Sequence, residues 1–303
     1  MNKVVKFGGS SLASAKQFKK VKDIIMADKS RRYVIPSAPG KRTTNDEKVT
    51  DLLYACYSAA SEGRSYKKIF DAITARYEQI ITGLDLNVNL DFEFKTIEEN
   101  FLAKKGRDYA ASRGEYLNGI IMAAYLGYEF IDAADVICFD ADGSFLSEKT
   151  NQELAARLSK VSKAVIPGFY GSMPDGSVKT FSRGGSDITG SLVARAVHAD
   201  LYENWTDVSG FLVADPRIVD NPEPIETITY RELRELSYMG ASVLHEEAIF
   251  PVRKEGIPIN IRNTNRPSDP GTMIVESTLK RPHYTITGIA GRKGFCAVNI
   301  EKA

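Results

Sequence analysis

The chain begins with a strand pattern that runs straight into two glycines. The segment Val4–Leu12 reads V-V-K-F-G-G-S-S-L; its β-branched residues suit a buried strand, and a helical pattern follows. A turn at Gly8 and Gly9 would point backbone N–H groups at an anion, with the positive end of a helix dipole behind them. Lys6 stands where its ammonium can reach the same anion. An ordinary strand-to-helix turn is the alternative, but the lysine favours phosphate binding, and no Walker motif is present here.

A second glycine turn follows the same plan. Thr180–Thr189 reads T-F-S-R-G-G-S-D-I-T and precedes a helical pattern. Arg183 stands before the two glycines, and a guanidinium can hold a carboxylate or a phosphate through two parallel hydrogen bonds. Asp187 follows them and could orient lysines, hold a metal, or simply favour a helix N-terminus. Two such turns, each with a basic residue close before it, are much less expected by accident than one.

Strand patterns alternate with helical patterns along most of the chain. The helical stripe of Ser14–Met26 precedes a short strand at Tyr33–Ile35. Later strands are expected at Ala164–Pro167, Leu201–Trp205, Ile257–Arg262 and Met273–Val275. This alternation predicts an α/β fold with a mostly parallel sheet covered by helices on both faces. Tyr66–Thr82 and Leu90–Lys104 have the length and spacing of two further helices, which form an α-rich insert.

Three segments between these elements lead to local predictions. Ser112–Glu115, S-R-G-E, has the form of a capping box, so we expect a helix to begin there, and the box alone would explain the glutamate. Tyr128–Asp132 and Asp135–Phe139 are expected as strands. Lys41–Lys48 is a polar, charged loop, which is either solvated or a substrate lid.

Charge and cysteine content exclude several classes of function. With a net charge of +1, the 303-residue chain has no electrostatic sign of binding nucleic acid or an anionic membrane. The chain contains no run of about 18 consecutive apolar residues, the length that a membrane-spanning helix needs. The three cysteines, Cys56, Cys138 and Cys296, have neither metal-site spacing nor a disulfide framework, which is typical of the reducing cytoplasm.

Taken together, the motifs resemble those of the aspartokinases in the amino-acid kinase family. The matching segments are K-F-G-G-S-S at 6–11, S-R-G-E at 112–115, S-R-G-G-S-D at 182–187, W-T-D-V-x-G and A-D-P-R within 205–217, G-A-x-V-L-H at 240–245 and I-R-N-T at 261–264. The resemblance covers nearly the whole chain, and the set in this order is highly specific although each member alone is weak.

The resemblance implies the amino-acid kinase fold, a three-layer α/β/α sandwich around a mostly parallel sheet. Residues 1–165 would form an N-terminal lobe for phosphoryl transfer and aspartate binding, and residues 166–283 a C-terminal lobe that binds ATP. Residues 284–303 look like the incomplete start of an ACT regulatory domain, because they read as two short strands around a glycine-rich turn.

The implied activity is phosphoryl transfer from ATP to the side-chain carboxylate of L-aspartate, giving 4-phospho-L-aspartate on the way to lysine, threonine and methionine. Such chemistry depends on positioning and charge neutralisation. Mg²⁺ is expected to bridge the ATP phosphates, with no metal site made by the protein itself. We expect a cytoplasmic homo-oligomer with no nucleic-acid or membrane partner.

Carried over position by position, the resemblance implies a role for each site residue. For phosphoryl transfer it implies Lys6, Gly8, Gly9 and Asp187. For aspartate binding it implies Ser10, Thr50, Glu115 at the ammonium, Arg183 at a carboxylate, Gly184, Gly185 and Ser186. For nucleotide binding it implies Lys6, Thr206, Asp207, Leu212, Arg217 and Ser242.

Two positions depart from the family pattern, and two other functions remain open. Ser242 stands where many relatives have a lysine that helps to hold ATP phosphates, and Leu212 replaces a tyrosine common near the nucleotide. One alternative is a kinase of the same fold that acts on glutamate, carbamate or a nucleotide monophosphate. The other is a catalytically weakened subunit that binds a nucleotide or an effector. Glu115 with Arg183 favours an amino-acid substrate, which needs one group for each charge.

Overall fold

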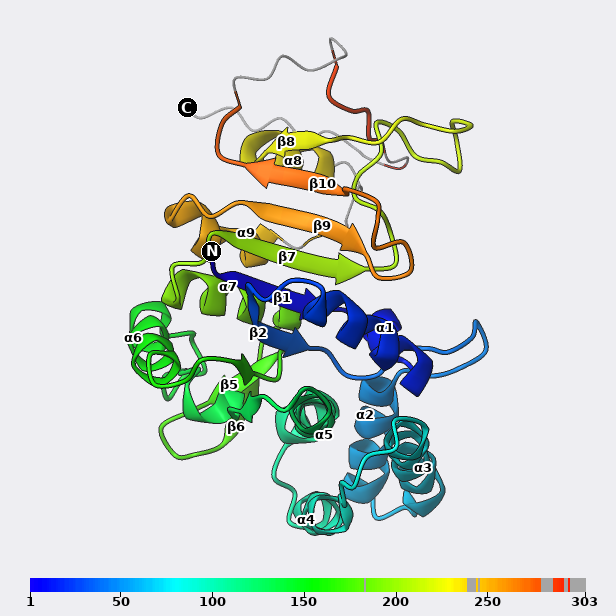
Figure 1. Cartoon of the computed structure of the whole chain (residues 1–303). Coiled ribbons are helices and arrows are strands. Elements are labelled where there is room, and N and C mark those ends of the chain that lie inside the picture. The colour runs from blue at the N-terminus through cyan, green and yellow to red at the C-terminus, as the bar shows by residue number, and fades with distance from the viewer. Residues whose placement is uncertain (183, 239–243, 245, 279–285, 292–293, 295–303) are drawn as a thin grey trace, which may run out of the picture.

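A single eight-stranded sheet organises the computed structural model, which describes residues 1–182, 184–238, 244, 246–278, 286–291 and 294 (Figure 1). The strand order is β3-β4-β2-β1-β7-β9-β10-β8. The strands are β1 (Lys3–Phe7), β2 (Arg31–Pro36), β3 (Glu129–Phe130), β4 (Ala164–Val165), β7 (Leu201–Thr206), β8 (Thr227–Thr229), β9 (Ile259–Asn263) and β10 (Thr272–Val275). All neighbouring strands pair in parallel except β9 and β10, which pair antiparallel.

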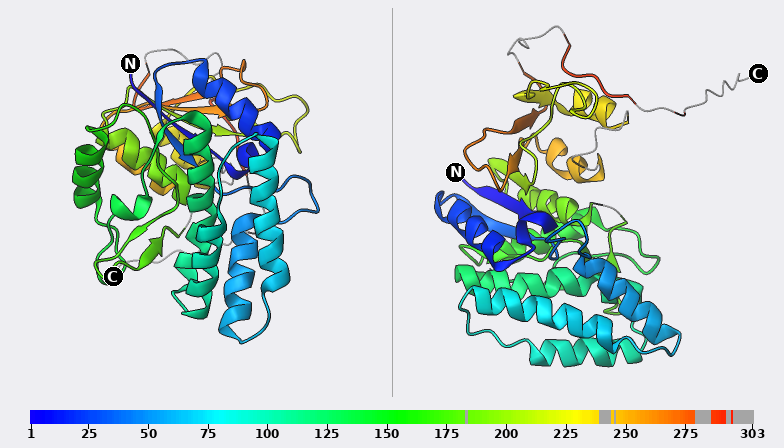
Figure 2. Two further views of the ribbon diagram at one scale, coloured as in Figure 1. Left: turned by 60° about the horizontal axis from the view of Figure 1, so that its bottom comes forward. Right: turned by 90° about the vertical axis from the view of Figure 1, so that its right-hand side faces the viewer.

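Helices cover both faces of this sheet, as the alternating patterns predict. One face carries α1 (Ala15–Met26), α2 (Val49–Ser61), α3 (Lys67–Gly83), α4 (Asp91–Leu102) and α5 (Arg107–Leu126). The other carries α6 (Ser147–Leu158), α7 (Gly185–Ala196), α8 (Tyr230–Tyr238) and α9 (Glu246–Lys254). Figure 2 shows α2–α5 packed as a bundle at the opposite end of the molecule from α8. The predicted α/β sandwich with an α-rich insert is confirmed.

The alternation of side chains along β1 explains the two cores. Val4 is fully buried in the core beneath α6–α9, whereas Val5 and Phe7 are fully buried in the core beneath α1–α5. Successive side chains of a strand point to opposite faces, so Lys6 shares the face of Val4. The strand therefore points Lys6 toward α7, the helix that follows the second glycine turn, whereas Lys3 lies on the opposite face with Glu203.

The predicted capping box at Ser112–Glu115 is wrong. Helix α5 begins five residues earlier, at Arg107, after Gly106 with a φ of 106°. Ser112 lies inside the helix, and its hydroxyl donates to the carbonyl of Tyr109 at 2.7 Å instead of capping an N-terminus. A helix that has already started leaves no free N–H group for the box to satisfy, so Glu115 needs another explanation.

Other boundaries also differ from the sequence prediction. Asp135–Phe139 is not a strand of the sheet: a 3₁₀ turn occupies Ala133–Asp135, and isolated bridges follow it. A separate hairpin, β5 (Tyr170–Ser172) with β6 (Val178–Thr180), was not predicted.

The lobe boundaries predicted from the resemblance remain predictions. Strands from 1–165 and from 166–283 join in one sheet through the pairing of β1 with β7. Most of the segment predicted to start a regulatory unit, 284–303, lies outside the described residues. No helix in the described ranges is both long enough and apolar enough to cross a membrane.

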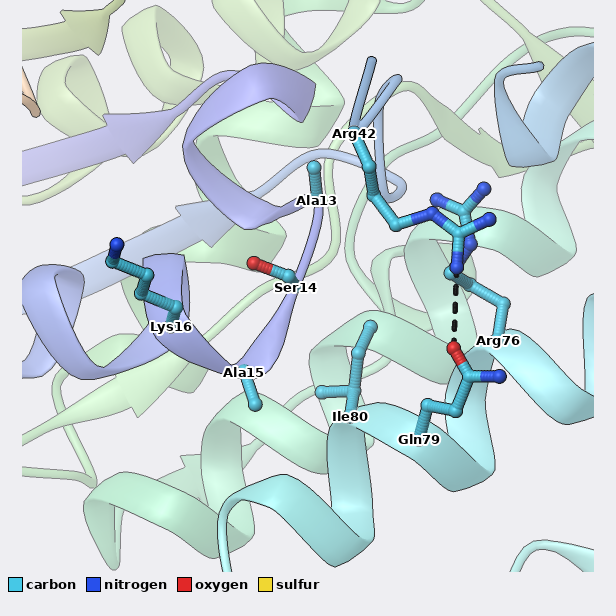
Figure 3. Close-up of a pocket in the computed structure, with 8 residues that line it drawn as sticks. All are labelled: Ala13, Ser14, Ala15, Lys16, Arg42, Arg76, Gln79 and Ile80. Atoms are coloured by element: carbon cyan, nitrogen blue, oxygen red, sulfur yellow. Dashed lines mark hydrogen bonds between the residues drawn. The ribbon is translucent and has the colours of Figure 1, made fainter. Parts of the chain in front are cut away.

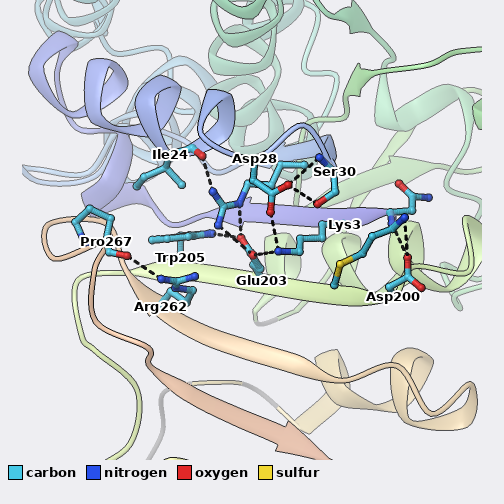
Figure 4. Close-up of polar contacts among 12 residues, drawn as sticks. Lys3, Ile24, Asp28, Ser30, Asp200, Glu203, Trp205, Arg262 and Pro267 are labelled. Atoms are coloured by element: carbon cyan, nitrogen blue, oxygen red, sulfur yellow. Dashed lines mark hydrogen bonds and ion pairs between the residues drawn. The ribbon is translucent and has the colours of Figure 1, made fainter.

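A fully buried carboxylate joins β7 to β1 and β2 on the α1 side of the sheet (Figure 4). Glu203 Oε2 accepts from Arg31 Nε and Trp205 Nε1, both at 2.8 Å. Its Oε1 accepts from Arg31 Nη2 at 3.2 Å and lies 3.3 Å from Lys3 Nζ. Because the carboxylate has two cations and an indole N–H, its charge is well compensated despite its burial.

We expect Glu203→Ala to destabilise the chain by about 3–5 kcal/mol, the usual cost of removing one partner from a buried ion pair. The reason is that the substitution leaves the buried guanidinium of Arg31 without its carboxylate. Urea unfolding followed by circular dichroism would measure the change.

Glu223→Ala is the matched control, because this glutamate is exposed. The urea concentration at the midpoint of unfolding of this variant should stay near the wild-type value. A Glu203→Ala chain as stable as the control would show that the cluster does not hold the strands together.

Candidate functional site

The predicted site residues gather where parallel strands end. Strands β1, β2, β7 and β9 end at Phe7, Pro36, Thr206 and Asn263, and the chain leaves the sheet at one edge after each of them. In open α/β sheets, ligands bind beyond this carboxyl edge. Both glycine turns lead to it: Gly8 and Gly9 follow β1, and Gly184 and Gly185 begin α7, which packs under β1 and β7.

Lys6 and Asp187 form the central charged pair of this edge. Lys6 Nζ lies 2.5 Å from Asp187 Oδ1, and the two side chains are only 10% and 14% exposed. The sequence predicts that Asp187 could orient a lysine, and the pair has that geometry. A metal is the other option for this aspartate, but no group of three or more His, Cys, Asp or Glu side chains among the described residues could hold one.

Sequence reasoning missed a third residue, Asn204, which contacts both members of the charged pair. Asn204 lies opposite Lys6 in the register of β1 and β7 and is 3% exposed. Its Nδ2 donates to Asp187 Oδ1 at 2.9 Å, and its Oδ1 accepts from Lys6 Nζ at 3.4 Å. The sequence did hold a sign of this role, because Asn204 is a polar residue at an inward position of the predicted strand Leu201–Trp205.

The first glycine turn is shaped by close backbone packing. Gly40 N–H donates to the carbonyl of Gly9 at 2.8 Å, and a Cβ atom on Gly40 would lie 2.6 Å from the carbonyl carbon of Gly9. Gly8 N–H donates to the carbonyl of Trp205 at 2.9 Å and so continues the ladder between β1 and β7. Gly8 is thus already hydrogen-bonded, and its missing side chain leaves room beside Lys6 Nζ, 3.7 Å from where a Cβ would stand.

The second glycine turn begins α7 with a left-handed residue. Gly184 has a φ of 58°, which glycine adopts at little cost. A Cβ on Gly185 would lie 2.8 Å from Phe169 Cα, so only glycine allows this approach. Ser186 is buried against Gly168. Arg183, the predicted carboxylate ligand, lies outside the described residues.

Glu115 is a buried carboxylate with an unfilled acceptor. It lies in α5 at 6% exposure, and its Oε2 has no hydrogen-bond partner. Burial raises the pKa of Glu115 to about 8, against the opposing effects of backbone hydrogen bonds, including one from Ala38, and the charges of Arg113 and Lys6. The charge of Lys6 is thus one of the interactions that favour the ionised form of Glu115.

Asn118, one turn further along α5, was also missed. It is fully buried; its Nδ2 donates to the carbonyl of Ser37 at 2.6 Å, and its Oδ1 has no partner. Residues three apart lie on the same face of a helix, so Glu115 and Asn118 both face the chain that leaves β2. The signal was present in the sequence, because Asn118 is a second polar residue three positions after Glu115 in a segment rich in apolar residues.

The polar loop after β2 is anchored to α3. Arg76, with a side chain only 4% exposed, donates to the carbonyl of Gly40 at 3.1 Å and pairs with Asp46 at 2.7 Å. Hydrogen bonds from Arg42, with the charges of Arg76 and Arg42, hold the pKa of Asp46 well below its usual range. Arg42 also donates to Gln79 at 3.1 Å. These contacts fix Gly40 beside the first glycine turn.

A small hollow of about 200 Å³ lies between this loop, the start of α1 and α3 (Figure 3). Its lining residues are Ala13, Ser14, Ala15, Lys16, Arg42, Arg76, Gln79 and Ile80. Both arginines in it already have carboxylate partners.

The remaining predicted residues fall in three places. Ser10 lies in the 3₁₀ turn Gly9–Leu12, and Thr50 lies in the first turn of α2. Thr206 and Asp207 end β7, where the Thr206 hydroxyl donates to Asp207 at 3.2 Å.

Two of the other predicted nucleotide contacts, Leu212 and Arg217, are exposed. Leu212 is 40% exposed, and the 87% exposed side chain of Arg217 pairs with Asp215 at 2.6 Å. Ser242 lies outside the described residues. Their predicted contacts with a nucleotide remain predictions.

The arrangement joins two complementary kinds of recognition. A glycine turn, a helix N-terminus and the Lys6 ammonium suit an anion. One oxygen of a buried carboxylate, Glu115 Oε2, and a buried amide oxygen, Asn118 Oδ1, have no donor and suit a cationic group such as an ammonium. A ligand with both kinds of charge would satisfy the whole edge.

Comparison with known proteins agrees with this geometry. The model of the amino acid kinase family matches residues 1–263. Aspartokinase 3 of Bacillus subtilis (strain 168) is 41% identical over 314 residues, which cover 99% of this chain and 69% of that protein.

Two solved structures share the fold at similar coverage. Aspartate kinase of Clostridium acetobutylicum is 57% identical with a TM-score of 0.90, over 95% of this chain and 66% of that one. Aspartokinase III of E. coli, in complex with aspartate and ADP, is 26% identical with a TM-score of 0.80, over 92% and 65%. The chain thus spans about two thirds of the length of these relatives, and it belongs to the amino acid kinase family and, within that family, to the aspartokinases.

Proposed function

We propose that this chain transfers the γ-phosphoryl group of ATP to the side-chain carboxylate of L-aspartate, giving ADP and 4-phospho-L-aspartate. The observation that carries the proposal is the buried carboxylate of Glu115, whose Oε2 has no hydrogen-bond partner. The similar E. coli aspartokinase III has been solved with aspartate and ADP, which are a substrate and a product of this reaction.

Glu115 takes the α-ammonium of aspartate. Its Oε2 has no donor, and Asn118 Oδ1 offers a second acceptor one helical turn away. An ammonium has three donors and would fill both. The bound ammonium would favour ionisation of Glu115, because the carboxylate and the ammonium then form an ion pair. The aspartate carboxylates would lie toward Lys6 and the predicted Arg183.

Lys6 stabilises the phosphoryl group in the transition state of its transfer. Its ammonium, the backbone at Gly9 and the N-terminus of α7 provide positive potential at the edge where β1 ends. Asp187 holds the ammonium at 2.5 Å and so fixes its position before the substrates arrive. Preorganised charge of this kind lowers the barrier because it need not be rearranged during the reaction.

Mg²⁺ fits the site only as a companion of the nucleotide. The described residues offer single carboxylates such as Asp187 and no cluster of three acidic or histidine ligands. Mg²⁺ commonly keeps several waters and is bound through substrate phosphates with one or two carboxylates. When bound, it would neutralise charge on the phosphates.

We also retain the predicted homo-oligomer and cytoplasmic location. The free thiols of Cys56 and Cys138 support the cytoplasmic location.

Another acceptor is the second candidate. A kinase of the same fold could phosphorylate glutamate, carbamate or a nucleotide monophosphate. Carbamate and nucleotide monophosphates lack an ammonium, so they would leave Glu115 unpaired. ADP release measured with aspartate, glutamate and carbamate in turn tests the proposal: turnover that does not depend on aspartate would overturn it. Nucleotide binding without turnover on any acceptor would favour a binding subunit.

We expect Lys6→Ala to lower kcat by about 100-fold or more while the KM for aspartate changes little. The reason is that the ammonium acts mainly on charge that develops in the transition state. A coupled assay of ADP release would give both constants.

Lys19→Ala on the exposed side of α1 is the control and should keep wild-type kcat. A Lys6→Ala enzyme within about threefold of wild type in kcat would contradict the assignment, since that is less than 1 kcal/mol of barrier.

We expect aspartate binding at pH 6–7 to release close to one proton from Glu115. Without ligand, its pKa of about 8 keeps the group mainly protonated in that range, and the incoming ammonium favours the carboxylate. The aspartate affinity should therefore rise with pH up to about 8 and then level off. In the ligand-free chain, by contrast, stability falls as pH rises. The raised pKa of Glu115 stabilises the folded state fully below pH 4.5, and this contribution is lost as the pH rises through 8.

Isothermal titration in two buffers of different ionisation enthalpy would measure the released proton. Glu115→Gln should abolish the release and weaken aspartate binding, whereas Glu99→Gln, at an exposed position of α4, should change neither. Equal proton release from Glu115→Gln and wild type would remove Glu115 from the substrate site.

A further inference from the structure

Asn204 is a buried polar residue on the sheet face that also carries the apolar side chains of Tyr202 and Ile261. In the parallel ladder it lies between Lys6 of β1 and Ile261 of β9, and only 3% of it is exposed. Ile261 and Tyr202, two residues before Asn204, are both fully buried in the core beneath α7. A primary amide at such a position costs free energy unless its donor and its acceptor both find partners.

Both ends of the Asn204 amide meet the charged pair. Nδ2 donates to Asp187 Oδ1 at 2.9 Å, and Oδ1 accepts from Lys6 Nζ at 3.4 Å. The chemistry fixes this orientation, because a carboxylate only accepts and an ammonium only donates. A rotated amide would set oxygen against oxygen at Asp187 and N–H against N–H at Lys6.

Strand β7 thereby holds Asp187 at two points. Besides the amide of Asn204, the hydroxyl of Tyr202 donates to the main-chain carbonyl of Asp187 at 3.1 Å. The ring of Tyr202 reaches this carbonyl across Gly190, where a Cβ would lie 2.4 Å from its hydroxyl oxygen. The tyrosine fixes the backbone of α7 at this residue, and the asparagine fixes the side chain.

We propose that Asn204 is a positioning residue for phosphoryl transfer: its amide bridges Lys6 and Asp187 and holds the ammonium at the site of transfer. The inference rests on the proposed function. A lysine on four methylenes can pair with a carboxylate in many rotamers, and the bridge selects one of them. Asn204 acts through Lys6 and Asp187 and need not touch a substrate.

The first test separates turnover from binding. Asn204→Leu keeps the approximate volume and removes both hydrogen bonds. We expect kcat to fall about 10- to 100-fold, with the KM values for aspartate and ATP within about threefold of wild type, because a displaced group slows chemistry more than binding. Asn204→Thr, whose short hydroxyl cannot span both partners, carries the test if the leucine variant does not fold.

Asn260→Leu is the matched control. Asn260 is also a nearly buried strand asparagine, but its register partner is Glu203, on the face opposite Lys6. Its kcat should stay within about threefold of wild type. An equal loss of kcat in the two variants would mean that disturbing the sheet, rather than the bridge, slows the reaction.

The second test does not need activity. Urea midpoints of Asn204→Leu, Asp187→Ala and the double variant form a cycle that measures the coupling of the two side chains. If the amide holds Asp187, Asn204→Leu should lower the midpoint clearly in the wild-type background and much less once Asp187 is alanine. Additive shifts would show that the amide does not hold the carboxylate and would overturn the proposal.

The outcomes distinguish this inference from the function on which it rests. A wild-type chain without aspartate-dependent ADP release would overturn the proposed function, and with it the catalytic role of Asn204. A wild-type chain that turns over, beside an Asn204→Leu chain with kcat within threefold of it, would overturn the role of Asn204 alone.

Discussion

The parallel pairing of β1 with β7 is the constraint on which the rest of the structure depends. It sets Lys6 beside Asn204 on one face of the sheet and Val5 beside Glu203 on the other. The period of two along each strand leaves no freedom, because a slip of one residue would move every charge to the wrong layer. One register therefore decides which buried charges support the sheet and which face the site at its edge.

Two buried carboxylates on the α1–α5 side of the sheet are compensated in different ways. Glu203, away from the site, has an arginine, a lysine and an indole N–H around it, so the folded chain satisfies it fully. Glu115 lies in α5 with one oxygen unpartnered and a pKa near 8. A buried carboxylate without a partner lowers stability, so the most economical account of Glu115 is a cation that arrives from outside. The contrast distinguishes a carboxylate that the fold satisfies from one that we propose to bind a ligand, without reference to any relative.

Much of the fold could be predicted because its signals are local. The stripe of α1, the β-branched start of β1 and the glycines that open α7 each depend on residues next to one another, and each element is found where expected. The errors arose where a local pattern had a second meaning. Ser112–Glu115 has the composition of a capping box but lies inside α5, because the helix starts five residues before Ser112, at Arg107. The capping box would have given Glu115 a purely structural role at a helix start, and the structure does not support that role.

Asn204 and Asn118 could not be predicted in the same way, because their roles are set by distant partners. Asn204 meets a lysine 198 positions away in the chain, and Asn118 meets the carbonyl of Ser37, 81 positions away. Only the register of β1 with β7 and the packing of α5 on the end of β2 bring these groups together. The glycine motifs name the residues that shape the backbone of a phosphate site. The residues that aim its charges lie on the neighbouring strand and helix, where an isolated polar residue at an inward position is the only sign of them. In an α/β fold of this kind, such residues become interpretable once the strand order is known.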